Sequence, residues 1–289
     1  MLVSDGANLR AMPSGSFVEA RWPRPSVMGV LNVTPDSFSD GGRFVEPMAA
    51  VEHARRLVGE GAALVDVGGE STRPGADGVS LSEELGRVLP VLEQLGDVPF
   101  SVDTSKAEVA RRAVELGAAL VNDVTALRGD PGMAEVVAGS DAFVCLMHMQ
   151  GEPRTMQVAP HYDDVVDDVL AFFEERIAFA AERGIDEGRI CVDPGFGFGK
   201  TPDQNLDLLR RLDEICVLGR PVLVGVSRKS TLGKVLGDDR ATQGSLAASL
   251  GAAVAAFTRG AWMIRAHDVA ETVDALAVAA AVERGKIRA

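Results

Sequence analysis

Three polar residues have side chains suited to binding a flat heterocycle. Asp103 and Asp193 are carboxylates, and Asn122 carries an amide. An ionised carboxylate can accept two parallel N–H bonds, so it can recognise a ring edge with adjacent donors. Each residue alone also has a structural explanation, because such an Asp often accepts bonds at a helix N-terminus and such an Asn often stabilises a turn. A binding role therefore requires a fold that brings the three together.

Other residues could bind an anion and a divalent cation. Lys229, Arg265 and His267 provide the positive charge that a phosphate group needs. Asn32 and Asp36 offer oxygen ligands compatible with Mg²⁺, which prefers few protein oxygens together with substrate phosphates. These residue types predict a site for a small phosphorylated ligand.

The candidate residues follow short apolar runs that have the length of β-strands. Eight such runs alternate with helical patterns, at residues 26–31, 63–68, 99–103, 119–123, 142–147, 189–193, 221–226 and 261–265. Apolar runs without alternation predict parallel strands that are covered on both faces. Capping boxes are predicted at Ser80, Ser105 and Thr201, each followed three residues later by Glu or Gln.

Eight strand–helix units in 289 residues predict an α/β fold, a (β/α)8 barrel forming a single domain over residues 26–289. A doubly wound open sheet is the structural alternative. In a barrel the polar strand ends converge on one mouth, where catalytic residues lie, and phosphate sites are frequent at the last two strands. Residues 1–25 are expected to form an extension that is either mobile or packed at an edge.

Composition excludes several classes of function. There are 42 acidic and 29 basic residues, which gives a net charge of −13 and argues against general nucleic-acid binding. Three widely spaced cysteines without a CxxC pair argue against a disulfide framework or a thiolate zinc site and predict a reducing cytoplasm. We see no secretory signal and expect no membrane association, because Thr, Gln, Ser and Gly dilute the longest uncharged run, 241–258.

Several longer segments resemble those of one enzyme family, the bacterial dihydropteroate synthases, which are pterin-binding TIM barrels. The segments are MGVLNVTPDSFSDGG (28–42), DVGGESTRPGA (66–76), SVDTSK (101–106), ND (122–123), LMHMQGEPRTMQ (146–157), DPGFGFGKT (193–201), GVSRKS (225–230) and IRAHDV (264–269). They occur in the family's order from about residue 26 to 285. The resemblance implies a transferase of folate biosynthesis that condenses 6-hydroxymethyl-7,8-dihydropterin diphosphate with 4-aminobenzoate and is inhibited by sulfonamides.

The resemblance also implies roles for individual residues. The catalytic group is expected to be Asp103, Asp193, Lys229 and Arg265. The pterin diphosphate side comprises Asp103, Asn122, Met147, Asp193, Lys229, Arg265, His267 and Arg73, with Met147 as an apolar wall. The 4-aminobenzoate side comprises Thr72, Pro74, Phe38, Phe198, Ser227 and Ser230, although the serines could instead cap a helix. Asn32 is the expected ligand of the cofactor, Mg²⁺.

Two alternatives and one other expectation accompany this interpretation. A pterin-dependent methyltransferase would share the pterin carboxylates but would not need the SRKS and GESTRPG segments. A catalytically degenerate paralogue would bind pterin diphosphate without condensing it. The resemblance also implies a homodimer, and it leaves the role of His148 open.

Overall fold

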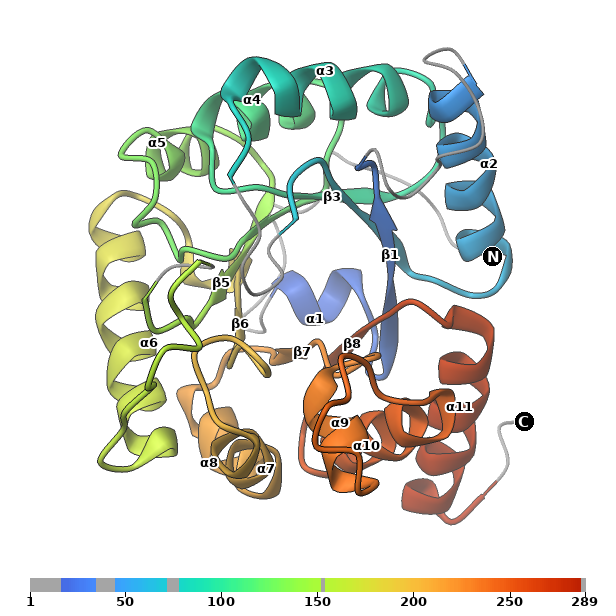
Figure 1. Ribbon diagram of the computed structural model, residues 1–289. Coiled ribbons are helices and arrows are strands. Elements are labelled where there is room, and N and C mark those ends of the chain that lie inside the picture. The colour runs from blue at the N-terminus through green and yellow to red at the C-terminus, as the bar shows by residue number, and fades with distance from the viewer. Residues whose placement is uncertain (1–16, 35–44, 72–77, 152–153, 287–289) are drawn as a thin grey trace.

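Eight parallel strands form the centre of the molecule, inside a ring of helices (Figure 1). The computed structural model describes residues 17–34, 45–71, 78–151 and 154–286. Within them the strand order is β6-β5-β4-β3-β2-β1-β8-β7, and a bridge between Val192 and Val222 joins the two outer strands. The predicted (β/α)8 barrel is confirmed, and the open sheet is excluded because the ring closes.

Strands and helices alternate along the chain, as in the predicted pattern. The strands are β1 Ser26–Asn32, β2 Leu64–Gly68, β3 Phe100–Asp103, β4 Leu120–Asp123, β5 Phe143–Met147, β6 Ile190–Asp193, β7 Leu223–Val224 and β8 Met263–Ala266. The α-helices are α1 Phe17–Arg21, α2 Val45–Gly59, α3 Leu81–Leu92, α4 Ala107–Glu115, α5 Met133–Ala138, α6 Val165–Glu182, α7 Pro202–Arg210, α8 Leu212–Ile215, α9 Ser230–Val235, α10 Leu246–Thr258 and α11 Val269–Arg284. Short 3-10 helices, η3 Glu187–Arg189 and η4 Cys216–Leu218, complete the described elements.

The strands are buried nearly throughout, which explains their uninterrupted apolar sequences. Residues in β2 to β7 are all buried, because the helices cover their outer faces and the opposite strands fill the interior. Full burial of a Val or Leu side chain stabilises the fold by about 1.5–3 kcal/mol relative to an exposed one. The barrel is therefore a packed core that holds the ends of the strands in fixed positions.

Two of the three predicted capping boxes are confirmed, at Ser80 and Thr201. The box predicted at Ser105 is wrong. Helix α4 begins after Lys106, and the side chain of Lys106 makes no capping hydrogen bond to the helix. Instead the first helical N–H, that of Ala107, donates to Asp130 Oδ2 at 2.9 Å. A carboxylate from a distant loop therefore replaces the local hydroxyl that the sequence pattern suggested.

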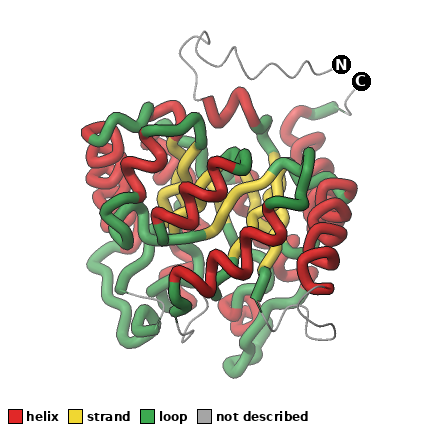
Figure 2. The backbone as a smooth tube through the Cα atoms, turned by 90° about the horizontal axis from the view of Figure 1, so that it is seen from above, coloured by secondary structure: helices red, strands yellow, loops and turns green. Residues whose placement is uncertain are grey.

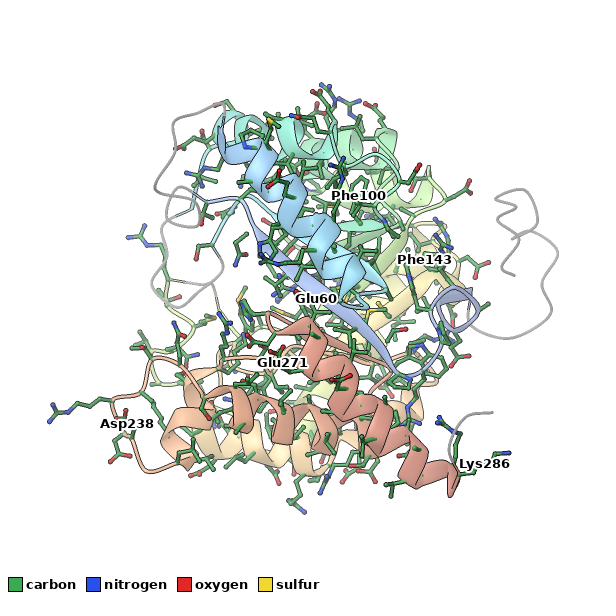
Figure 3. The ribbon with its side chains drawn as sticks, turned by 90° about the vertical axis from the view of Figure 1, so that its right-hand side faces the viewer. Glu60, Phe100, Phe143, Asp238, Glu271 and Lys286 are labelled. Carbon is green, nitrogen blue, oxygen red and sulfur yellow. The ribbon has the colours of Figure 1, made fainter. Side chains whose placement is uncertain are left out.

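The residues before β1 close one end of the barrel. Figure 2 shows α1 at this end and the loops that follow the strands at the opposite end. Trp22 is 3% exposed, and its ring packs edge-on against Phe143 at a centroid distance of 5.0 Å. Phe143, which is labelled in Figure 3, belongs to β5. Trp262 Nε1 also donates to the Trp22 carbonyl at 2.6 Å. Val18 and Trp22 are thus part of the packed core at the end away from the mouth.

None of the helices in the described part of the chain has both the length and the apolar character of a membrane-spanning segment.

Candidate active site

The carboxyl ends of the strands bring predicted site residues into one buried layer. Backbone pairing sets Asp103 beside Asn122 across β3 and β4, and Met147 beside Asp193 across β5 and β6. Asp103, Asn122 and Asp193 have exposed fractions of only 7%, 4% and 6%. Asn32 ends β1 at the same end of the barrel and is partly buried. The three residues selected for heterocycle binding therefore lie in one layer at the same end of the barrel.

The centre of this layer is Asp66, a residue of β2 that the sequence analysis did not select. It is fully buried, and its Oδ1 accepts a bond from Ser101 Oγ at 2.7 Å. Its Oδ2 accepts from Asn122 Nδ2 at 2.9 Å and from Arg265 Nε at 2.7 Å. Arg265 also donates through Nη2 to Asp103 Oδ2 at 2.9 Å. One carboxylate thus fixes a predicted pterin ligand and a predicted catalytic cation from two other strands.

The ion pairs determine the charge of Arg265. Burial alone would lower the pKa of its guanidinium, but the carboxylates of Asp66 and Asp103, with a smaller contribution from Asp193, raise it above its ordinary value. Arg265 is therefore a permanent cation in the layer. Its side chain is 21% exposed, so part of it can still contact a ligand.

Asp103 has the electrostatic properties of a binding carboxylate. Burial raises its pKa from 3.8 to about 7, Arg265 opposes this shift, and the negative charges of Asp66, Glu84 and Asp123 add to it. Its Oδ1 is buried and, among the described residues, has no hydrogen-bond partner. A buried acceptor without a partner is costly in free energy. An N–H group of a bound ligand would remove that cost.

Asp193 provides a second carboxylate at the end of β6. Burial raises its pKa, and the backbone N–H of Gly195, which donates to Oδ1 at 2.8 Å, opposes this. The cations of Lys229, Arg265 and Lys200 lower its pKa further toward the ordinary value. Positive charge from three segments of the chain therefore favours the ionised form of Asp193.

The predicted cations gather at β7 and β8. The ammonium of Lys229 lies 4.1 Å from the centroid of the Phe198 ring, a cation–π contact between the predicted pterin and aminobenzoate sides. Ser227 Oγ lies 3.1 Å from His267 Nδ1 and accepts the backbone N–H of His267 at 3.2 Å. Ser227 therefore orients the His267 ring. Ser230 begins α9 and is exposed.

An apolar cluster lies over the carboxyl ends of β4 and β5. It consists of Val124, Met147, Met149 and Met156, and Phe198 packs against it. Met147 is 3% exposed, in agreement with an apolar wall. The sequence analysis did not select Met149 or Met156. Flexible, polarisable methionine side chains suit the face of an aromatic ring.

Comparison with known proteins agrees with this geometry. The family model described as "Pterin binding enzyme" matches residues 28–267. The dihydropteroate synthase of Escherichia coli (strain K12) is 49% identical over 265 residues, which cover 91% of this chain and 93% of the relative. The chain belongs to the dihydropteroate synthase family.

Solved structures of the dihydropteroate synthase family have the same fold. The Xanthomonas albilineans dihydropteroate synthase with 4-aminobenzoic acid is 51% identical, with a TM-score of 0.82, and covers 90% of this chain and 94% of its own. The same enzyme in complex with 7,8-dihydropteroate is 49% identical, with a TM-score of 0.80, at the same coverage. The Yersinia pestis dihydropteroate synthase with a sulfonamide drug is 47% identical, with a TM-score of 0.82, and covers 90% of this chain and 95% of its own.

Some predicted residues of this dihydropteroate synthase family member lie outside the described part of the chain. They are Phe38, Thr72, Arg73 and Pro74, together with the alternative Mg²⁺ ligand Asp36. The base of the loop that contains Thr72 is described. Glu70 Oε2 and the buried Glu84 both accept bonds from Lys106 Nζ at 2.5 Å, and Glu70 Oε1 accepts the Val79 N–H at 3.2 Å. The bond between Glu70 and Val79 joins the two ends of the loop, and the partly buried ion triad fixes Glu70.

Proposed function

We propose that the chain is a transferase that condenses 6-hydroxymethyl-7,8-dihydropterin diphosphate with 4-aminobenzoate. The bond between the pterin methylene carbon and the diphosphate oxygen breaks, and a bond from that carbon to the amine nitrogen forms. The amine loses a proton, and the products are 7,8-dihydropteroate and pyrophosphate. The observation that carries the proposal is Asp103, a buried carboxylate beside Asn122, one of whose oxygens has no partner within the described part of the chain. The chain is also about half identical to dihydropteroate synthases.

The pterin ring would bind against the buried carboxylates. Asp103 and Asp193 would accept the ring's N–H groups, and Asn122 would provide a further polar contact. Because positive charge develops on the pterin as the carbon–oxygen bond breaks, the same carboxylates would stabilise the transition state more than the ground state. Met147 would cover one face of the ring.

The leaving diphosphate would be bound by the cations of the last two strands. Lys229, Arg265 and His267 would stabilise the negative charge that grows on it, which is preorganised electrostatic catalysis. Asn32, at the carboxyl end of β1, would offer Mg²⁺ one oxygen, and this ion needs few protein ligands because it keeps several waters and binds substrate phosphates. When bound, Mg²⁺ supplies Lewis-acid stabilisation of the diphosphate. The described residues contain no group of three or more His, Cys, Asp or Glu side chains that could hold a metal, so the proposal rests on Asn32 and the ligand's oxygens.

The aromatic amine would be positioned rather than chemically activated. Phe198, together with Phe38, Thr72 and Pro74, would form its binding side, and Ser227 and Ser230 would lie near its carboxylate. Holding the amine nitrogen near the methylene carbon makes the attack effectively intramolecular, which accounts for much of the acceleration. No side chain has to form a covalent intermediate.

The test is release of pyrophosphate by the purified protein with Mg²⁺ and pterin diphosphate, with and without 4-aminobenzoate. We expect turnover that depends on 4-aminobenzoate and is lost in Lys229→Ala. The exposed Lys234 on α9 provides the matched control, and Lys234→Ala should keep the activity. Tight pterin diphosphate binding without turnover would identify a degenerate paralogue instead. Absence of binding would overturn the proposal.

Sulfonamide inhibition and a homodimer in the cytoplasm complete the proposal. A sulfonamide resembles 4-aminobenzoate and should therefore compete with it for the Phe198 side of the site.

A contact between copies of the chain is supported by two exposed apolar side chains on α11, Val278 at 66% and Val282 at 76%. Light scattering of the purified protein tests the dimer, and a monomer at micromolar concentration would contradict it.

A further inference from the structure

A buried lysine lies beneath the loop that joins β6 to α7. Lys200 is 2% exposed, and its Nζ donates to His148 Nδ1 at 2.9 Å, to the Gly195 carbonyl at 3.1 Å and to the Phe198 carbonyl at 3.0 Å. An ammonium group has three N–H donors, so each acceptor can receive one. Two acceptors belong to the loop itself and the third follows β5. Lys200 therefore ties the loop to the neighbouring strand end.

The loop held by Lys200 has little freedom to take another position. Gly195 has a φ of 68°, and a Cβ atom there would lie 1.9 Å from the carbonyl oxygen of His148. The Gly197 N–H donates to Asn205 Oδ1 at 2.6 Å. Phe198 lies within this loop, so the bonds that hold the backbone also set the position of its side chain. Asp193 is the last residue of β6, and its pairing with Met147 of β5 fixes it separately.

The charges around Lys200 indicate why its donors matter. Burial lowers the pKa of the Lys200 ammonium to about 7, Asp193 raises it, and Lys229 lowers it further. A neutral amine has only two N–H donors for the three acceptors. Loss of the proton would therefore release one of the three contacts.

The other titratable and charged groups that face this ammonium are consistent with an acceptor role for His148. Burial lowers the pKa of His148 well below its ordinary value, and the cations of Lys200 and Arg128 lower it further. The ring is therefore neutral and can accept a bond at Nδ1. Tyr162 lies with its ring centroid 6.0 Å from Lys200 Nζ, and its hydroxyl donates to the Gly199 carbonyl at 2.7 Å.

We propose that Lys200 is a positioning residue for 4-aminobenzoate: its ammonium holds the 194–200 loop so that Phe198 lies against Lys229. This inference rests on the proposed function. Lys200 acts through the loop and does not itself contact the substrate. Its loss should therefore affect the aminobenzoate side more than the pterin side, where Asp103 and Asn122 belong to other strands.

The experiment compares steady-state kinetics of the wild type, Lys200→Met and the exposed-lysine control Lys234→Met, with each substrate varied in turn. We expect Lys200→Met to raise KM for 4-aminobenzoate by about tenfold or more, because the substitution removes hydrogen bonds that a charged group donates. KM for pterin diphosphate should change less than about threefold. In the wild type, KM for 4-aminobenzoate should rise as the pH increases through about 7. This pH dependence should be absent in Lys200→Met.

The outcomes separate the two proposals. If the wild type turns over and Lys200→Met has the same KM values, or equal increases in both, the inference about Lys200 fails and the proposed function stands. If the wild type shows no aminobenzoate-dependent turnover, both fail. If Lys200→Met does not fold, His148→Leu decides, because it removes one acceptor and keeps the ammonium. A rise in KM for 4-aminobenzoate alone supports the inference, and unchanged kinetics overturn it.

Discussion

Substitution of Asp66 by Asn tests whether the buried network sets pterin affinity. The change keeps the shape of the side chain and removes its charge. The new amide can still accept from Asn122 and Arg265 if the Ser101 hydroxyl, which now donates to Oδ1, turns to accept instead. Arg265 would then have Asp103 as its main anionic partner. It would compete for the Asp103 oxygen that has no partner among the described residues.

The size of the effect follows from the type of hydrogen bond that is lost. Bonds to charged groups contribute about 1.5–3 kcal/mol and neutral ones about 0.5–1.5 kcal/mol, so Asp66→Asn should cost about 1–2 kcal/mol of pterin binding. This corresponds to an affinity about 5- to 30-fold weaker. Because the negative charge of Asp66 raises the pKa of Asp103, its removal should also lower that pKa below about 7.

Calorimetric titration of pterin diphosphate across a pH series measures both effects. The matched control is Asp123→Asn, which removes another buried strand-end carboxylate. Asp123 binds only its own turn in the described structure, through Thr125 and Leu127. Asp123→Asn should lower the melting temperature with little change in pterin affinity. It should shift the pH profile less than Asp66→Asn does, because the charge of Asp123 raises the pKa of Asp103 less than that of Asp66. A folded Asp66→Asn protein with wild-type affinity and an unshifted pH profile would refute the reasoning.

Four further predictions concern pH and stability. Pterin diphosphate should bind more weakly in calorimetry as the pH falls through about 7, because Asp103 becomes protonated. Because this pKa is raised, the folded state binds the Asp103 proton more tightly than the unfolded state does. The resulting contribution to the free energy of unfolding is fully present below pH 3.8 and is lost as the pH rises through about 7. Comparing the wild type with Asp103→Asn in denaturant titrations checks that sign. Trp22→Ala should lower the free energy of unfolding by about 3–5 kcal/mol without changing KM, whereas a changed KM would contradict its separation from the mouth. Lys106→Met should cost about 3–5 kcal/mol because it leaves buried Glu84 without its cation, and adding Glu84→Gln should recover much of the loss in the same titrations.

The barrel could be predicted from the sequence because each strand is buried on both faces and therefore reads as an apolar run. The bounds agree to within one residue for most strands. The exceptions are the run at 261–265, which begins two residues before β8, and the run at 221–226, where only Leu223–Val224 pair as β7. The second differs most. Its end residues leave the ladder, since Val222 makes a single bridge to Val192 and Val226 precedes the loop that holds Lys229.

The buried network could not be predicted because its contacts depend on register between distant strands. Asp66 lies inside an apolar run, and only the pairing of β2 with β3 sets it beside Ser101. A charged residue within such a run was the available signal. The residues around Ser105 have the spacing of a capping box. In the structure, however, the N–H of Ala107 donates to Asp130, which is distant along the chain. Lys200 belonged to a recognised segment, yet its partner His148 follows a different strand.

The grouping of Lys229, Arg265 and His267 at one end of a molecule with a net charge of −13 has a kinetic consequence. A diphosphate anion is repelled at long range and attracted only within about 10 Å of the mouth at 0.1 M salt. Added salt screens the long-range repulsion more than the short-range attraction. The rate of association should therefore increase with moderate ionic strength, which is the opposite of electrostatic steering by an oppositely charged protein surface. Substrate entry in this molecule is governed by a local field that acts against the field of the whole protein.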